Sequence, residues 1–258
     1  MSTSPTPRSS SHANTPRPDQ AQPKPRAADY PPSNCLLAEL PQPEFERLIP
    51  HLSIKLLHLG DVLANAGDVV EYVYFPLSGV ISHVLTSEEG TDVEVGLHGH
   101  EGLSGLEAIF LDGRMLYRAS VQVPGRALRL PAEFFRAQFD MGGVLQKIAL
   151  RHLQTASALT AQSVLCNRLH TTEERLCRWL LMVHDRVQGD QMELTQEFIA
   201  NMLGTRRSGV TVACGALKNA GFIEYERGCI TVLDRQGLED SSCECYKAIG
   251  QHTPRLPA

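Results

Sequence analysis

The chain has no stretch of about 18 consecutive apolar residues, so the sequence predicts no membrane-spanning helix. Its first residues also lack an apolar segment of the kind that directs secretion, and we therefore expect a cytoplasmic protein with no membrane partner. Positive charge is not in excess, because 24 Lys and Arg stand against 29 Asp and Glu among 258 residues. The net charge of −5 excludes a broadly basic chromatin-type protein, although a local basic patch would still suffice to bind DNA.

Cysteines are few and scattered: there are seven, and no two of them form a CxxC pair. Because their number is odd and the expected compartment is reducing, we interpret them as mostly free thiols. Cys243 and Cys245 form a CxC near the end of the chain, but a zinc or redox role would need partner ligands that the sequence does not place. We therefore interpret this pair as incidental thiols and predict no metal site and no cofactor.

Catalytic motifs are also missing, since the chain has neither a P-loop nor a recognisable set of Ser, His and Asp for nucleophilic catalysis. The segment GLHGHEG contains His98 and His100, which on a strand would point the same way and share a metal ion. A cupin enzyme would add a glutamate a few residues on, but Glu101 is too near and Glu107 too far. A cupin-like metalloenzyme, or a ligand-binding module with a helical protein-interaction tail, therefore stays as the alternative function.

Composition divides the chain into parts. Residues 1–34 are dominated by Ser, Thr, Pro, Ala and Gln, which bury too little apolar surface to fold, and they predict a disordered tail. Residues 35–142 open with a helical pattern from Leu36 to Leu48 that Pro50 ends. Short runs of Val, Leu, Tyr and Phe between glycine turns follow, a spacing typical of an antiparallel sandwich or barrel.

Residues 143–170 predict one long helix in which side chains of one row recur every seven residues. This is the spacing of helices that pair along a seam. The row would pack either against the β-domain of its own chain or against the same helix of a second chain, and the pattern does not decide between them. The row consists of Leu145, His152, Leu159 and Cys166, with Ile148 and Leu169 beside it.

Residues 171–250 contain an amphipathic helix followed by the segment LTQEFIANMLGTRRSGVTVACGALKNAGFI, which predicts two short helices broken at Gly204. Thr195 is the expected N-cap of the first helix and Thr205 of the second, which places Arg206 and Arg207 in the first turn of the second helix. A supporting helix joined by a tight turn to a helix with an exposed basic start is the helix-turn-helix arrangement.

The second helix is the candidate DNA reader, because arginine pairs bidentately with guanine in the major groove. The alternative is a plain helical hairpin with two solvated arginines. Cations at a helix start oppose the macrodipole, and this mild conflict favours a bound partner. The candidate DNA-binding residues are Thr205, Arg206, Arg207, Ser208, Thr211 and Val212, with Thr205 and Arg206 also candidates for phosphate contacts.

The segment FIEYERGCITVL then predicts a two-stranded hairpin, which would form a wing beside the second helix. Its turn is expected at Arg227-Gly228. Asp234 is expected to cap a last helix from about Arg235 to Ala248, before a short tail over residues 251–258.

From about residue 36 to 248 the chain resembles the Crp/Fnr family of bacterial transcription regulators. GDVLANAGDVVEYVYFPLSGVIS is similar to the start of the family's cyclic-nucleotide-binding-like β-roll, and the two-helix segment is similar to its winged helix-turn-helix. The resemblance implies an α+β fold with an N-terminal antiparallel β-roll, a long dimerisation helix and a C-terminal winged helix-turn-helix. It also implies a homodimer that binds a palindrome in double-stranded DNA, with RNA polymerase as a further partner.

Two positions depart from the family's reading helix. Arg207 stands where members commonly have a base-contacting arginine, but Ser208 stands at a position that is commonly glutamate. Val212 replaces a second arginine and would at most touch a thymine methyl group. We therefore expect an operator that differs from the best-known one of the family.

The resemblance also implies an effector pocket in the β-roll, at Gly105, Leu106, Tyr117, Arg118 and Ala119. Leu106 stands where cyclic-nucleotide binders have a ribose-binding glutamate, and Arg118 falls one place after the phosphate-binding arginine, which turns a strand residue to the other face. The sequence therefore disfavours cyclic AMP or GMP and leaves the small-molecule effector unidentified. The iron–sulfur branch of the family uses a cysteine cluster near the N-terminus, where this chain has only Cys35.

Overall fold

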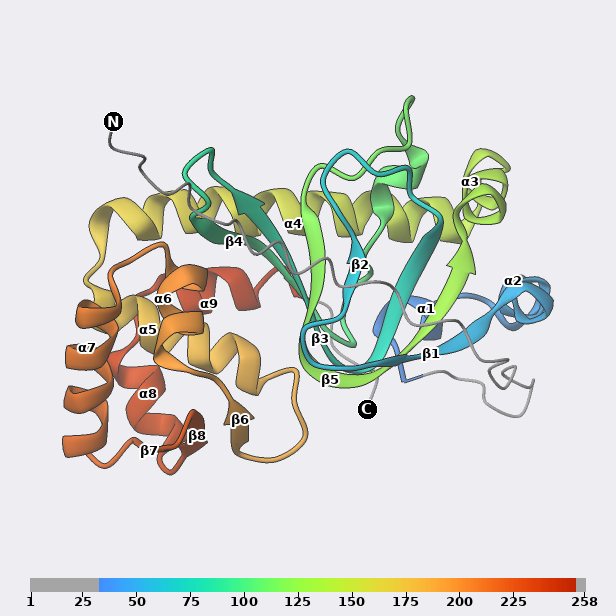
Figure 1. Ribbon diagram of the computed structural model, residues 1–258. Helices are drawn as coiled ribbons and strands as arrows, with labels where there is room; N and C mark the ends of the chain where they lie inside the picture. The colour runs from blue at the N-terminus through green and yellow to red at the C-terminus, as the bar shows by residue number, and fades with distance from the viewer. Residues whose placement is uncertain (1–32, 254–258) are drawn as a thin grey trace, which may run out of the picture.

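The computed structural model describes residues 33–253, and Figure 1 labels their elements. A β-sheet body and a smaller helical domain lie at opposite ends, and one long helix runs beside both (Figure 1). The predicted α+β architecture is confirmed. Among these residues no helix combines the length and the apolar character needed to cross a membrane.

Both predicted tails lie mainly outside the described residues, and their inner ends differ from the prediction. Asn34 was placed in the disordered segment, yet its side chain is buried and its amide donates to the carbonyl of Gly102 at 2.9 Å. At the other end, the carbonyl of His252 accepts from the Thr155 hydroxyl at 3.1 Å. Hydrogen bonds to the folded body therefore fix Asn34 and His252, two positions that composition assigns to the tails.

The predicted helix from Leu36 to Leu48 is two helices, α1 (Cys35–Ala38) and α2 (Gln42–Leu48). Pro41 stands between them in an extended conformation with φ −55° and ψ 141°. Proline has no backbone N–H to continue a helix, so the chain starts a new one after it. A short 3₁₀ turn, η2 (Ile49–His51), follows α2 and contains Pro50.

The β-roll is a five-stranded sheet in which every pairing is antiparallel, as the spacing of turns predicts. Four strands follow the order β1-β5-β3-β4, and β2 also pairs with β5. A Cβ atom on Gly125 would lie 2.2 Å from the Ser78 carbonyl oxygen, so the two longest strands approach here only because residue 125 is glycine. The strands are β1 (Ser53–Leu57), β2 (Val62–Ala64), β3 (Tyr72–Thr86), β4 (Asp92–His98) and β5 (Arg118–Pro131).

Two further elements complete the roll, η3 (Leu106–Ile109) and α3 (Ala132–Asp140). The long helix α4 (Val144–Leu169) then runs from α3 to the helical domain (Figure 1) and matches the predicted helix over 143–170. Its row with sevenfold spacing faces the chain's own body, because Leu145, His152 and Cys166 are all buried. This row therefore serves packing within the chain.

The C-terminal domain contains the predicted two-helix segment, and a third strand, β6, joins the predicted hairpin in the order β6-β8-β7. A capping box between Thr171 and Glu174 starts the first helix of the domain. The elements are α5 (Thr172–His184), β6 (Gln191–Glu193), α6 (Gln196–Leu203), α7 (Arg207–Asn219), β7 (Ile223–Glu226), β8 (Cys229–Val232), α8 (Arg235–Ser241) and α9 (Cys245–Gly250).

The predicted last helix is in fact the pair α8 and α9. Asp234 caps α8 as expected, since its carboxylate accepts from the Gly237 amide at 2.9 Å. Ser242 then takes an extended conformation with ψ 153°, which interrupts the helix. The resulting corner turns Cys243 and Cys245 inward, where both are buried.

The domains share a hydrophobic core. Val80 and Val84 of β3 and Leu97 of β4 pack in one cluster with the buried side chains of α5, α6 and α7. A second cluster lies within the roll and includes the start of α4. The helical domain is therefore docked on the sheet through apolar contacts, and β4 belongs to both sides of the junction.

Candidate functional site

The helix-turn-helix is built by α6 and α7. Thr195 caps α6 as predicted, accepting from the Phe198 amide at 3.1 Å, and Gly204 ends the helix with φ 58°. The cap of α7 differs from the prediction, because Arg206, not Thr205, is the N-cap residue. The Thr205 amide donates to the Ala200 carbonyl at 2.9 Å, so Thr205 closes α6 and belongs to the turn.

One face of α7 is buried and the other is open. Val210, Ala213, Cys214 and Leu217 form the buried stripe, as predicted. The side chains of Arg206, Arg207, Ser208, Thr211 and Val212 are exposed, and Thr205 is half-buried.

The two arginines have no internal partner within residues 33–253, where neither guanidinium forms a hydrogen bond or an ion pair. The first turn of α7 contains no acidic residue, and the N-cap side chain bonds no backbone amide. The free amide groups of the helix start therefore add a partial positive charge to that of the arginines. The arginines and the helix-start amides together favour binding of an anion from another molecule, such as a phosphate group.

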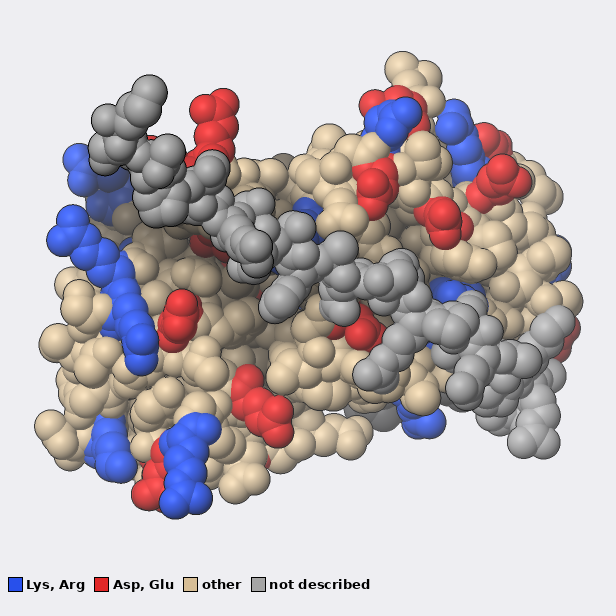
Figure 2. All heavy atoms as spheres, in the orientation of Figure 1, with Lys and Arg blue, Asp and Glu red and all other residues tan. Residues whose placement is uncertain are grey.

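The wing beside α7 has the predicted turn. Arg227 and Gly228 both have positive φ angles, 49° and 82°, which two-residue hairpin loops of type I′ require. Figure 2 shows Lys and Arg side chains gathered at this end of the molecule, over α7 and the wing. A basic surface thus exists locally in a chain of net negative charge.

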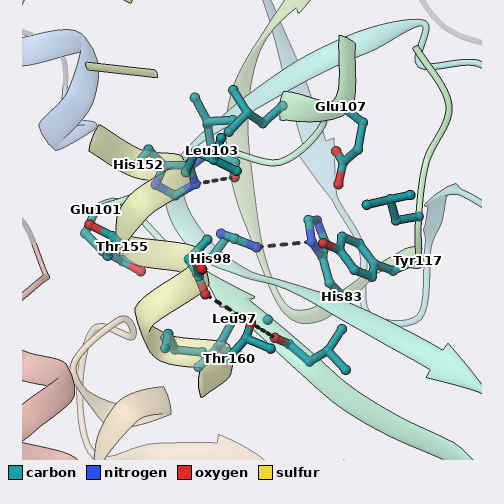
Figure 3. Close-up of a pocket in the computed structure, with 18 of the residues that line it drawn as sticks. His83, Leu97, His98, Glu101, Leu103, Glu107, Tyr117, His152, Thr155 and Thr160 are labelled. Carbon is teal, nitrogen blue, oxygen red and sulfur yellow. Dashed lines mark hydrogen bonds between the residues drawn. The ribbon is translucent and has the colours of Figure 1, made fainter. Parts of the chain in front are cut away.

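A second candidate site is a cavity of about 480 Å³ bordered by β3, β4, η3, the residues just before β5 and the middle of α4 (Figure 3). The predicted effector residues do not all meet in it. Leu106 and Tyr117 line this cavity, whereas Gly105 and Ala119 line a separate one beside β2. Arg118 forms an ion pair with Asp92 of β4, so its charge is already engaged.

Three buried histidines from three elements meet in the cavity (Figure 3). His98 Nε2 lies 3.2 Å from His83 Nδ1, and His83 Nε2 lies 2.7 Å from the Ser104 hydroxyl. His152 of α4 faces His98 with 5.4 Å between ring centroids. Burial lowers the pKa of all three, that of His83 to about 3, so the rings are neutral at ordinary pH.

His98 and His100 do not converge, contrary to the arrangement considered from the sequence. Strand β4 ends at His98, which points into the cavity, and His100 in the following turn lines a different cavity beside α9. The shared metal ligand pair of a cupin is therefore not formed.

Sequence reasoning considered Glu101 and Glu107 only as metal ligands and missed that both line this cavity. Glu107, one residue after Leu106, is buried in η3, lines the cavity (Figure 3), and has one carboxylate oxygen without a hydrogen-bond partner in the described chain. Burial raises the pKa of Glu107. Arg186 is the one arginine or lysine among the described lining residues, and its Nε donates to Glu101 at 2.7 Å.

The two matched regions decide the identity. Residues 54–141 match the cyclic nucleotide-binding domain, and residues 174–241 match the Crp-like helix-turn-helix domain. The chain belongs to the Crp/Fnr family. It is a DNA-binding transcription regulator and not an enzyme, so the cupin-like alternative is withdrawn.

Solved structures share the fold of this Crp/Fnr protein at low sequence identity. A Crp/Fnr-family protein from Eubacterium rectale is 18% identical, with 80% of this chain and 96% of that chain covered and a TM-score of 0.65. FixK2 from Bradyrhizobium japonicum is 16% identical, with coverages of 74% and 98% and a TM-score of 0.64. The c-di-GMP responsive regulator CLP from Xanthomonas campestris is 15% identical, with coverages of 74% and 99% and a TM-score of 0.58. No curated protein matches the chain.

In this Crp/Fnr protein, strand β4 joins the cavity to the helix-turn-helix. Leu97 and His98 line the cavity, and Glu94 on the same strand accepts from the indole N–H of Trp179 in α5 at 2.8 Å. The Val93 side chain lies against Gly204 at the turn between α6 and α7. Strand β4 therefore contacts the cavity, α5 and the turn between α6 and α7 directly.

Proposed function

We propose that the protein is a homodimer that reads a palindromic promoter site with α7 of each chain and acts on RNA polymerase. The supporting observation is the open first turn of α7, where two arginines and the free helix-start amides face away from the chain. Arg207 begins the helix and is proposed to contact a guanine. Arg206 and Thr205, at the turn, are proposed to hold phosphates, and Val212 to touch a thymine methyl group.

The homodimer is supported by an exposed row on α4, opposite the row that packs on the chain's own body. Val164 and Leu169 are each 68% exposed, and Leu150 is 48% exposed. Exposed positions separated alternately by four and three residues have the spacing of a coiled-coil seam, and a second copy of α4 is proposed to cover them. The row consists of Leu150, Gln154, Ser157, Ala161, Val164 and Arg168, with Leu165 and Leu169 beside it.

The cavity is proposed to hold a small uncharged effector with a mostly apolar surface. Arg186, the one arginine or lysine among the described lining residues, is engaged by Glu101, and Arg118 is engaged by Asp92, so neither guanidinium is free to bind a phosphate. Neutral imidazoles and the unpartnered oxygen of Glu107 offer hydrogen bonds instead. Calorimetric titration with cyclic AMP and cyclic GMP is expected to show no binding, and saturable binding of either would contradict this choice.

The DNA-reading role is tested by selecting bound fragments from random DNA and titrating the selected site against a scrambled one. Arg207→Ala is expected to lose about 1–3 kcal/mol of preference at one base pair. Arg206→Ala is expected to weaken selected and scrambled DNA alike and to flatten the dependence of affinity on salt. Arg126→Ala, an exposed change on the roll, is the matched control and should leave both affinities unchanged.

The two arginine variants are expected to differ, because a base contact affects one sequence and a phosphate contact affects all sequences. Equal losses on selected and scrambled DNA for both variants would contradict a base contact by Arg207. An enriched site without twofold symmetry would contradict the proposed pair of reading helices.

A further inference from the structure

Four potential metal ligands meet where the long helix ends. Cys166 and His170 lie one helical turn apart at the C-terminal end of α4, and Cys243 and Cys245 come from the corner between α8 and α9. The three sulfur atoms and one ring nitrogen of His170 all lie within 4.8 Å of one another. All three thiols are buried, and the His170 side chain is only 12% exposed.

The distances fit one tetrahedral ion. With Zn–S bonds of about 2.3 Å and a Zn–N bond of about 2.1 Å, tetrahedral zinc sets its sulfurs roughly 3.8 Å apart, and sulfur and nitrogen roughly 3.6 Å apart. Cys166 Sγ and Cys243 Sγ are 3.5 Å apart, and Cys245 Sγ lies 3.5 Å from His170 Nδ1. The cysteines are free thiols, since a disulfide would bring two sulfurs to about 2.05 Å.

The groups around the four ligands are also those of a metal site. His170 Nε2 lies 3.2 Å from a Glu244 carboxylate oxygen, so the ring turns Nδ1 toward the thiols. A carboxylate on the far nitrogen is the usual means of orienting a zinc-bound histidine. The Gln162 amide donates to Cys245 Sγ at 3.0 Å, a bond that a thiolate accepts more strongly than a thiol.

Two buried arginines beside the four ligands also favour a negatively charged metal site. Arg175 and Arg178 of α5 are buried, both interact electrostatically with the Cys166 sulfur, and the Nε of each lacks a hydrogen-bond partner in the described chain. Zn²⁺ with three thiolates and one neutral imidazole carries a net charge of −1, which these guanidinium groups would balance. Without thiolates nearby, two such buried cations are costly to hold.

We propose that Cys166, His170, Cys243 and Cys245 bind one Zn²⁺ that fastens the end of α4 to the α8–α9 corner of the DNA-binding domain. Four protein ligands leave no open position, so the ion is structural. A single ion suits the short separations, whereas an iron–sulfur cluster would hold its ligands further apart. The ion would fix the angle between the dimerisation helix and the reading helix, which sets the spacing of the two half-sites.

The metal content of the purified full-length protein tests the site. Reduced protein saturated with Zn²⁺ and then desalted is expected to hold one zinc per chain. Cys243→Ser and Cys245→Ser are expected to lose nearly all of it. Cys229→Ser is the matched control, because this thiol lies on the wing outside the cluster, and it should keep one zinc per chain.

Binding of Co²⁺ distinguishes a variant that has lost the metal site from one that has lost its fold. Wild-type protein with Co²⁺ is expected to show thiolate-to-cobalt charge transfer and the visible bands of a tetrahedral ion. Glu244→Gln leaves all four ligands in place and is expected to keep the spectrum while weakening affinity about 10–100-fold. Folded, reduced wild-type protein that binds neither zinc nor cobalt would overturn the proposal. Iron with labile sulfide in the purified protein would overturn it equally.

Discussion

Glu94 is expected to make the stability of this protein fall as the pH rises toward neutrality. Its carboxylate accepts from the Ser82 hydroxyl at 2.7 Å and from Trp179 at 2.8 Å, at the junction of the roll and the helical domain. Burial outweighs these hydrogen bonds and the nearby arginines, and it raises the pKa of Glu94 to about 7. The folded protein therefore holds a proton there that the unfolded chain has already released.

The sign and size follow from this difference. Between the ordinary pKa of the carboxyl and its folded value, the folded state binds more protons, so its stability is full at low pH and is lost as pH rises through about 7. The loss is at most about 1.4 kcal/mol per pH unit and levels off near the folded pKa, so it comes to about 1.6 kcal/mol between pH 5.5 and 7. The exposed part of the half-buried side chain makes this an upper value.

Glu94→Gln removes the titration and keeps the shape of the side chain. Urea unfolding followed by the fluorescence of Trp179, the one tryptophan of the chain, measures the free energy of unfolding at each pH. The variant should gain stability relative to wild type as the pH rises from 5.5 to 7.5. The control Glu89→Gln, on the exposed end of the same hairpin, should track wild type. A difference between Glu94→Gln and wild type that does not change with pH would refute the reasoning.

Three other perturbations have defined outcomes. Val164→Asp places a charge in the exposed row of α4 and should shift sedimentation from dimer to monomer, while a monomeric wild-type protein would contradict the proposed seam. Gly215→Ala meets no atom within 4 Å and should stabilise α7 by about 1 kcal/mol in thermal unfolding. Weaker DNA binding by that stable variant would show that a side chain at residue 215 hinders the approach of α7 to the DNA groove. Unchanged binding would show that it does not. In Glu94→Gln, the three cavity histidines should lower stability as pH falls below about 6.5, because the unfolded chain takes up protons first. The low pKa of His83 alone contributes up to about 2 kcal/mol between pH 6.5 and 5, and a flat profile in urea unfolding would disprove neutral burial.

Local chemistry made parts of the fold predictable. Gly204 ends α6 because only a residue tolerant of positive φ closes that helix, and the Arg227-Gly228 turn follows from the backbone twist of a two-residue hairpin. Predicted helix boundaries were wrong by one or two residues where a neighbouring element forms the hydrogen bond that was expected within the helix. The Thr205 amide bonds back to α6, so the cap of α7 falls on Arg206.

The cavity was only partly predictable. Leu106 and Tyr117 were found from the resemblance, but His83, His152 and Glu107 come from β3, α4 and η3, and no spacing in the sequence relates them. Arg118 was considered for the pocket, and its pairing with Asp92 depends on which strand lies beside β5 and β3. A cavity is lined by whatever side chains the packing of separate elements brings together, so its chemistry appears only in three dimensions.

The sequence by itself determined the order of the domains, the long helix, the helix-turn-helix and the outward position of Arg207, since periodicity, caps and glycines act over a few residues. Tertiary structure alone decided which face of α4 stays open, which histidines meet, and that Cys166 and His170 approach Cys243 and Cys245. The physical reason is range: hydrogen bonds of turns and caps join near neighbours, whereas burial joins side chains 77 residues apart, as in the pair Cys166 and Cys243.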